Sequence, residues 1–166
     1  SGIDKRIHSL KIQKRSEGEF GKTTVHQFVL SGSGRLAEEP AVRTRHIEFI
    51  GNSLTCGYGT DGKHRDEPFL VETENCNLTF ASMVARYYDA DYTLIAHSGR
   101  GAARNYGDSV RVSKVTMKDR MLNTFDEDLT HKWNFKEYRP DLVVINLGSN
   151  DFSTEPHPYK SEFTKA

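Results

Sequence analysis

A short apolar run from His46 to Ile50, rich in β-branched and aromatic residues, predicts a buried β-strand. The run ends at Gly51, and Asn52 and Ser53 follow it, which is the usual signal for a tight turn into a helix. The Ser53 hydroxyl is therefore expected at the C-terminal end of a strand and near a helix N-terminus, where free N–H groups favour developing negative charge. A simple helix cap is the competing interpretation of Asn52 and Ser53.

Two further apolar runs predict strands that also end at glycines. Residues 93–98 form one of them, and Gly99-Arg100-Gly101 follows it. Residues 142–147 form the other, a continuous apolar run of the kind found in strands buried on both faces. This third strand ends in Gly148-Ser149-Asn150-Asp151.

Helical patterns separate these three strands. The first begins at about Leu78 and the second spans Val112 to Phe125, where β-branched residues make the pattern less regular. In the first helix the apolar stripe predicted to face the core consists of Leu78, Ala81, Val84, Ala85 and Tyr88. The βαβαβ order predicts an α/β fold with a parallel, doubly wound sheet and right-handed crossovers.

Residues 3–34 carry a β-type pattern instead, with turn residues at 17–21 and a second apolar run at 25–30. Two or three strands cannot bury two faces by themselves, so we expect them to be the end of an antiparallel sandwich. The chain is accordingly divided into residues 1–44, the sandwich part with its linker, and residues 45–166, the α/β part.

Composition excludes several classes of protein. The 23 basic and 23 acidic residues cancel, so no global field favours nucleic acid or an anionic membrane surface. No apolar stretch approaches the ~20 residues of a membrane span. Cys56 and Cys76 permit one disulfide without requiring it, and neither has the spacing of a zinc ligand, so we expect no metal and no cofactor.

The carboxyl ends of parallel strands lie at the same edge of a sheet, so Ser53, Gly99 and Asn150 are predicted to converge. Acyl transfer is the chemistry that needs such a set, because a serine hydroxyl attacks a carbonyl and the resulting oxyanion requires donors aimed at it. Ser53 and Gly99 would supply backbone N–H groups, and Asn150 its side-chain amide. Ordinary turn chemistry is the competing interpretation at each single position.

These residues resemble a known family. Gly51-Asn52-Ser53-Leu54, Gly99 after a strand, and Gly148-Ser149-Asn150-Asp151 are similar to the first three conserved blocks of SGNH (GDSL-type) hydrolases, whose name lists Ser, Gly, Asn and His. The resemblance implies a flavodoxin-like, three-layer α/β domain with a parallel sheet.

Longer strings at residues 47–59, 97–101 and 150–153 resemble more narrowly the second carbohydrate esterase family. Those enzymes are acetylxylan esterases that carry a β-jelly-roll domain in front of the SGNH domain. Residues 45–163 share this resemblance, and residues 3–34 are similar to the end of the jelly roll.

The resemblance implies Ser53 as the nucleophile, with Ser53 N–H, Gly99 and Asn150 as the oxyanion hole. Asp151 would support the loop beside the nucleophile. Asn52 stands where the family usually has Asp, which removes a charge from the turn. Three aromatic residues are candidates for stacking on a sugar, with core packing as the alternative: Tyr58, Trp133 and Phe152.

The sequence also departs from the family in its general base, which the family carries in an Asp-x-x-His motif after the third block. No such motif follows Asp151, and a serine hydroxyl is a poor nucleophile without a base. His157 lacks the Asp three positions earlier, and for His97 a structural or substrate-side role is the stronger interpretation. We therefore expect the base histidine of the intact enzyme to lie beyond Ala166.

A flavodoxin-like sheet would also place the strand at residues 142–147 in its centre, with further strands beside it. Only a short polar stretch follows this strand, so one edge of it is expected to be bare. We expect the sequence to be the interior of a larger protein, whose remaining C-terminal segment is either lost or bound as a separate chain.

The sequence thus predicts a serine esterase that removes O-acetyl groups from plant-wall polysaccharide without a metal or cofactor. The resemblance implies a secreted or periplasmic location and acetylated polysaccharide as the partner, with no role for nucleic acid or a membrane. A lipid or thioester hydrolase of the same fold and a catalytically silent carbohydrate-binding protein remain alternatives. A nucleotide-binding flavodoxin-like protein is a weaker one, because no phosphate-binding glycine motif is present.

Overall fold

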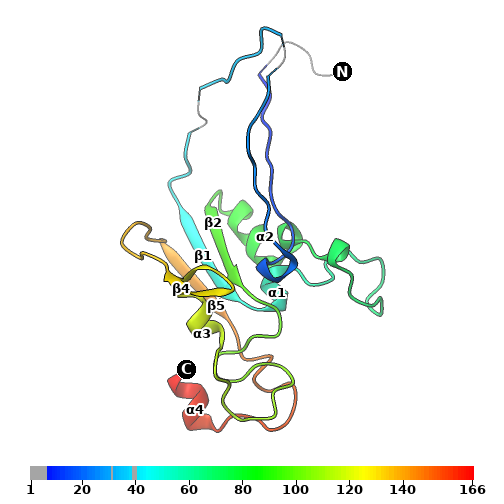
Figure 1. Cartoon of the computed structure of the whole chain (residues 1–166), viewed down its shortest axis with the longest axis vertical. Coiled ribbons are helices and arrows are strands. Elements are labelled where there is room, and N and C mark those ends of the chain that lie inside the picture. Colours follow the sequence, from blue (N-terminus) through cyan, green and yellow to red (C-terminus); the bar gives the residue numbers. More distant parts are fainter. Residues whose placement is uncertain (1–6, 31, 39–40) are drawn as a thin grey trace.

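The three strands predicted for the α/β part form one parallel sheet in the computed structural model, which describes residues 7–30, 32–38 and 41–166 (Figure 1). Strand β1 (His46–Gly51) lies between β2 (Asp91–Ala96) and β5 (Leu142–Asn146). In the register, the last residue of β1 stands beside Ala96 on one side and Asn146 on the other. The α/β fold, the parallel sheet and the common edge for the strand ends are confirmed.

Helix α2 (Phe80–Tyr87) covers one face of this sheet. Its N-terminus is capped by Thr79, whose side chain accepts a hydrogen bond from the Ser82 N–H. The core between helix and sheet is small and consists of Ile47, Phe49, Ala81, Ala85 and Ala90, with Tyr92, Leu94 and Val144 packed against it. The predicted stripe is therefore only half right, because its larger members, Leu78, Val84 and Tyr88, are exposed.

No long helix covers the opposite face in the described part of the chain. Residues 13–18, the short helix α3 (Met117–Arg120) and a hairpin of β3 (Asn123–Phe125) and β4 (Asp128–Lys132) lie there instead. A cavity of about 680 Å³ remains between them and the sheet.

The helix predicted over residues 112–125 is wrong, and local polar groups explain the difference. The Asp119 carboxylate accepts the Thr116 N–H, which starts a single helical turn. The chain then reverses at Asp126 and Glu127 and continues as β4. The β-branched residues that weakened the helical pattern belong to this irregular stretch.

Strand β5 is an edge strand of the described sheet, and the expected bare edge is present. The prediction that this strand is buried on both faces is wrong for the described chain, since Leu142, Val143 and Ile145 are exposed, Ile145 to 65%. Its apolar composition alone did not determine its burial, which depends on what lies beside the strand.

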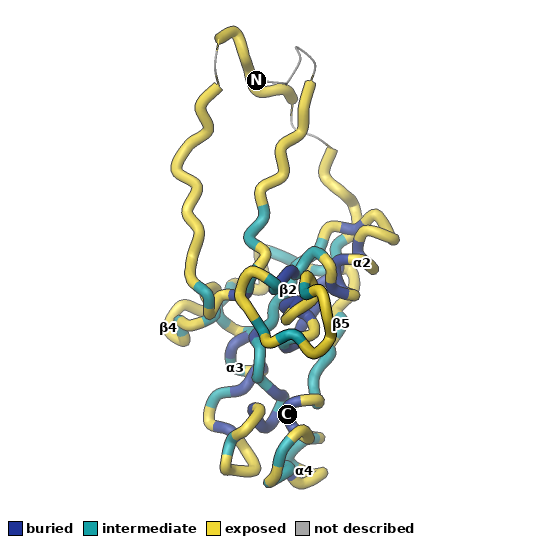
Figure 2. Tube along the Cα trace, turned by 90° about the vertical axis from the view of Figure 1, so that its right-hand side faces the viewer, coloured by how far each residue is buried: buried dark blue, intermediate teal, exposed yellow. Residues whose placement is uncertain are grey.

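The described residues 7–12, 21–30, 32–38 and 41–45 are exposed and form no helix or strand, and the described part of this N-terminal region extends away from the sheet (Figure 2). Residues 13–18 lie against the sheet face instead. The strands predicted over residues 3–34 are not present among the described residues of that range; residues 3–6 and 31 lie outside the described part. The predicted turn at 17–21 is confirmed as a 3-10 helix, η1 (Gly18–Phe20). The jelly-roll assignment and the boundary at residue 45 stay predictions.

The remaining elements are short. They are α1 (Ser53–Cys56), η2 (Val71–Thr73), η3 (Cys76–Leu78) and α4 (Lys160–Lys165). No described helix has the length and apolar character that crossing a membrane would require.

Truncation of Phe49 tests the core. Its side chain is 1% exposed and meets the Phe80 ring edge-on at 6.0 Å. Phe49→Ala is expected to lower the free energy of unfolding by about 3–5 kcal/mol, because it removes apolar contacts and leaves a cavity. Phe28→Ala is the matched control, since Phe28 is 62% exposed. Equal losses in a urea titration of the two variants would contradict this assignment of the core.

Candidate active site

The β1–α1 junction places Ser53 at the first position of a helix directly after a strand. Asn52 is fully buried, and its side-chain oxygen accepts the Leu54 N–H at 3.3 Å, so it caps α1. Its amide nitrogen donates to Ser149 Oγ at 2.9 Å, which ties this turn to the end of β5. Asn52 is thus a cap and also a link between two strand ends. The half-buried Ser53 has an Oγ that forms no hydrogen bond with the described residues.

Gly99 lies in the turn after β2, with φ of +75°, a conformation that side chains rarely adopt. Its carbonyl accepts the Tyr106 N–H at 2.8 Å. Its own N–H has no hydrogen-bond acceptor among the described residues and is available to a ligand.

Asn150 lies in the turn after β5 and is 8% exposed. One hydrogen of its amide is used, because Nδ2 donates to the Arg100 carbonyl at 2.8 Å. This bond fixes the Asn150 side chain beside the turn that carries Gly99. The second amide hydrogen remains available.

Asp151 is fully buried and holds the loop that follows Gly99. Its carboxylate accepts three backbone N–H groups, those of Ala102 at 3.0 Å, Ala103 at 2.7 Å and Arg104 at 2.8 Å. A side chain on Gly101 would place its Cβ 2.5 Å from Asp151 Oδ2, so only glycine allows this close approach.

Arg104 belongs to the same assembly, although nothing in its sequence context singled it out. Its side chain is fully buried, and the guanidinium donates to the backbone carbonyl of Val110 at 3.0 Å and to that of Thr154 at 2.8 Å. It also donates to the carbonyl of Asp108. Arg104 therefore joins the loop after β2 to the segment after β5. A single arginine in a polar stretch has no periodicity that could have revealed this role.

The structure thus joins the turns that carry Ser53, Gly99 and Asn150 by direct hydrogen bonds between side chains and neighbouring turns. Among the described residues, the Ser53 N–H, the Gly99 N–H, the second Asn150 amide hydrogen and the Ser53 hydroxyl all lack a hydrogen-bond partner. Such an arrangement can hold a developing oxyanion, because the donors are fixed before any substrate arrives.

The structure separates one of the three aromatic candidates from the other two. Tyr58 is close to Ser53, since its N–H donates to the Ser53 carbonyl at 3.0 Å, and its ring stacks on Phe69 at 3.7 Å. The ring of Phe152 packs edge-on against Phe163 at 5.0 Å. Trp133 lines the cavity on the sheet face, which does not include Ser53. In this structure Trp133 is separate from the other two candidates.

Neither His97 nor His157 is hydrogen-bonded to Ser53. His97 is 3% exposed, and its Nδ1 bonds Asp126 Oδ2 at 2.6 Å, an interaction that lowers the pKa of Asp126 against the opposing effect of burial. His157 Nδ1 lies 3.4 Å from the Glu155 carboxylate. The structural role that the sequence favoured for His97 agrees with its buried contact with Asp126.

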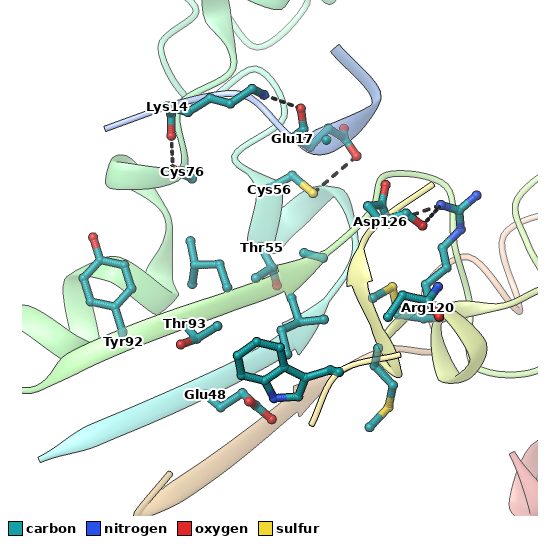
Figure 3. Close-up of a pocket in the computed structure, with 18 of the residues that line it drawn as sticks. Lys14, Glu17, Glu48, Thr55, Cys56, Cys76, Tyr92, Thr93, Arg120 and Asp126 are labelled. Atoms are coloured by element: carbon teal, nitrogen blue, oxygen red, sulfur yellow. Dashed lines mark hydrogen bonds and ion pairs between the residues drawn. The ribbon is translucent and has the colours of Figure 1, made fainter. Parts of the chain in front are cut away.

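Glu17 and Cys56 line the cavity (Figure 3) and belong to a buried polar cluster that the sequence did not indicate. It consists of Glu17, Cys56 and Glu74, with one potential ligand atom from each lying within 4.8 Å of the others. Burial raises the pKa of the Cys56 thiol, so this group is protonated in the absence of a metal. Both cysteines are free: Cys56 Sγ contacts Glu17 Oε2 and Cys76 Sγ contacts the Lys14 carbonyl, each at 3.6 Å.

The sequence and the fold are similar to those of known proteins. Residues 47–166 match the family model of GDSL-like lipases and acylhydrolases. The chain is 38% identical over 154 residues to a cellulase/esterase, CelE, of Acetivibrio thermocellus, covering 93% of this chain and 18% of that protein. It is 36% identical over 150 residues to an acetylxylan esterase/glucomannan deacetylase of Cellvibrio japonicus, covering 89% of this chain and 40% of that protein.

Among solved structures, a family two carbohydrate esterase from Clostridium thermocellum in complex with cellohexaose matches with a TM-score of 0.73 and 39% identity. The match covers 81% of this chain and 40% of that structure. The chain therefore spans less than half the length of these relatives.

Neutralising Asp151 tests the support of the loop after Gly99. Asp151→Asn replaces one acceptor oxygen by an NH₂ group facing backbone N–H donors. We expect a loss of about 2–4 kcal/mol in unfolding free energy and faster amide exchange at Ala102 to Arg104. Asp66→Asn is the control, because the Asp66 side chain is 84% exposed. Unchanged exchange in that loop would show that Asp151 does not hold it.

The buried Glu74 carboxyl is expected to make the free energy of unfolding depend on pH. Burial raises its pKa to about 7; the Glu17 N–H bond opposes this rise and the nearby Glu17 carboxyl adds to it. The folded state holds this proton more tightly than the unfolded chain does. The protonated Glu74 carboxyl therefore contributes fully to the free energy of unfolding below about pH 4.5, and this contribution is lost as pH rises through 7. Glu74→Gln keeps the neutral form and should gain stability over wild type, on the order of 3 kcal/mol, between pH 4.5 and 8.

Urea titrations at pH 4.5 and at pH 8 measure the difference in unfolding free energy between wild type and Glu74→Gln. Glu72→Gln, at an exposed carboxylate two residues earlier, should leave the pH dependence of the wild type unchanged. Parallel pH profiles for wild type and Glu74→Gln would contradict the assignment.

Proposed function

The chain belongs to the GDSL-like lipase/acylhydrolase family, and from this premise we propose that it is a serine esterase that removes O-acetyl groups from polysaccharide of the acetylxylan or acetylmannan type. The observation that carries the proposal is that the turns of Ser53, Gly99 and Asn150 leave the sheet at one edge and are joined by hydrogen bonds, with donors that have no acceptor among the described residues. The names of the relatives support the substrate class, since one is an acetylxylan esterase/glucomannan deacetylase and another was solved with cellohexaose.

In the proposed reaction, Ser53 Oγ attacks the acetyl carbonyl carbon and gives up its proton to a general base. The carbonyl oxygen becomes an oxyanion, which accepts hydrogen bonds from the Ser53 N–H, the Gly99 N–H and the Asn150 amide. The sugar hydroxyl leaves after taking the proton back from the base. Water then attacks the acetyl-serine by the same steps in reverse order and releases acetate.

We propose that the base is a histidine other than His97 and His157, contributed from outside residues 1–166. The supporting observation is that His97 is held by Asp126 and His157 lies beside Glu155, both without a bond to Ser53. The exposed edge strand β5 is consistent with further chain packing beside it.

The same proposal assigns residues 1–44 to the end of a jelly-roll domain that helps to shape the glycan cleft, and it places the enzyme in a secreted or periplasmic location. Tyr58 is the aromatic candidate that lies nearest in sequence to the nucleophile, with its stacked Phe69. We propose that this pair, rather than Trp133, contacts sugar.

The test is acetate release from acetylated xylan and acetylated mannan by a polypeptide extended at both ends beyond residues 1–166. Ser53→Ala is expected to lower kcat by about 10⁴–10⁶-fold without changing the folded structure. Residues 1–166 alone should show only the small residual rate of an oxyanion hole without a base.

Asn150→Asp serves as a second variant, because it keeps the size of the side chain and replaces the donor by an acceptor. Its expected loss in kcat is about 10²–10³-fold. Undiminished acetate release by Ser53→Ala would refute the acyl-enzyme, and full turnover by residues 1–166 alone would refute an external base.

A further inference from the structure

Glu17 reaches from the N-terminal segment into the edge of the sheet that carries the proposed site. It lies directly before η1, is 7% exposed, and its Oε2 accepts the Ser98 N–H at 2.7 Å. The same oxygen lies 3.6 Å from Cys56 Sγ, in the helix that begins with Ser53. One carboxylate therefore contacts both elements that carry the backbone donors of the proposed oxyanion hole.

The bond to Ser98 constrains the peptide group immediately before the one that contains the Gly99 N–H. On the other side, the Gly99 carbonyl is fixed by the Tyr106 N–H at 2.8 Å. The Gly99 peptide is thus held between two anchored neighbours, while its N–H is unbonded among the described residues. A glycine at φ +75° has little conformational preference of its own, so these anchors determine where its N–H points.

Further contacts hold Glu17 itself in place. Its N–H donates to Glu74 Oε2 at 3.2 Å, and its carbonyl accepts the Lys14 ammonium at 2.6 Å. His97 Nδ1 lies 4.0 Å from Glu17 Oε2 and is bonded to Asp126. Burying a carboxylate is costly, and here the bonds to Oε2 offset part of the cost, while the buried Oε1 has no hydrogen-bond partner among the described residues.

We propose that Glu17 is a positioning residue of the esterase, which acts through Ser98 to set the direction of the Gly99 N–H toward the oxyanion. This inference rests on the proposed function. It adds that the N-terminal segment, which the sequence assigns to a different domain, supplies part of the support of the active site. Glu17 contacts neither the substrate nor the reacting atoms.

The first test is the kinetics of acetate release by the polypeptide extended beyond residues 1–166. Glu17→Ala should lower kcat about 10–100-fold with KM nearly unchanged, because a misplaced oxyanion donor weakens transition-state binding without weakening substrate binding. Glu17→Gln should restore most of kcat, since the glutamine carbonyl can still accept the Ser98 N–H. Glu72→Ala, at an exposed carboxylate, is the control and should match the wild type.

If Glu17→Ala does not fold, Glu17→Asp replaces it, because Asp keeps the charge but is one methylene too short to reach Ser98. The expected fall in kcat is the same. Unchanged kcat in the folded variant would overturn the inference, as would parallel losses of kcat for Glu17→Ala and Glu17→Gln.

The second test does not depend on catalysis. In amide NMR spectra of residues 1–166, the Ser98 proton should resonate at low field in the wild type, as expected for a donor to a carboxylate. It should move upfield in Glu17→Asp, together with a change at Gly99. Unmoved Ser98 and Gly99 signals would overturn the inference even if the esterase activity is confirmed. Moved signals, together with no acetate release by the polypeptide extended beyond residues 1–166, would uphold the contact and refute the proposed function.

Discussion

The parallel pairing of β1 with β2 on one side and with β5 on the other is the constraint on which the rest of the structure depends. In this register Gly51, Ala96 and Asn146 stand side by side, so three chain segments that are far apart in sequence leave the sheet at one edge. An antiparallel or shifted partner would send one of the three turns to the opposite edge or displace it along the strand. The proposed chemistry is possible because the backbone ladder brings these turns together before any side chain acts.

Buried polar groups then turn this shared edge into a defined site. Asn52 links the first turn to the third, and Asn150 and Asp151 link the third to the second. Each of these groups is largely removed from water and would be costly to bury without its partners. Most of the hydrogen-bonding capacity of these groups is used internally. The Ser53 N–H, the Gly99 N–H and one Asn150 amide hydrogen are the donors at this edge that remain available to a ligand. A preorganised arrangement of this kind needs little rearrangement when negative charge develops.

Much of this site could be predicted because strand ends and glycine turns are local signals. The short apolar runs predicted the three parallel strands. The turn residues that follow these runs indicated Ser53, Gly99 and Asn150 as candidate site residues. The helix over residues 112–125 and the burial of β5 could not be derived in this way, since both depend on neighbouring segments rather than on apolar spacing. Glu17 was hidden for the same reason: in sequence it is one acidic residue in a turn, and only tertiary contact with Ser98 reveals it.

The central claim is that Ser53, Gly99 and Asn150 together hold one tetrahedral oxyanion. The most direct measurement is a crystal structure of the protein after reaction with a small alkyl phosphonate ester that forms a stable tetrahedral adduct with a reactive serine. We predict phosphorus bonded to Ser53 Oγ, with one phosphonyl oxygen about 2.7–3.1 Å from the backbone nitrogens of Ser53 and Gly99 and from Asn150 Nδ2. An adduct on another residue, or a phosphonyl oxygen facing solvent away from Gly99 and Asn150, would contradict the account.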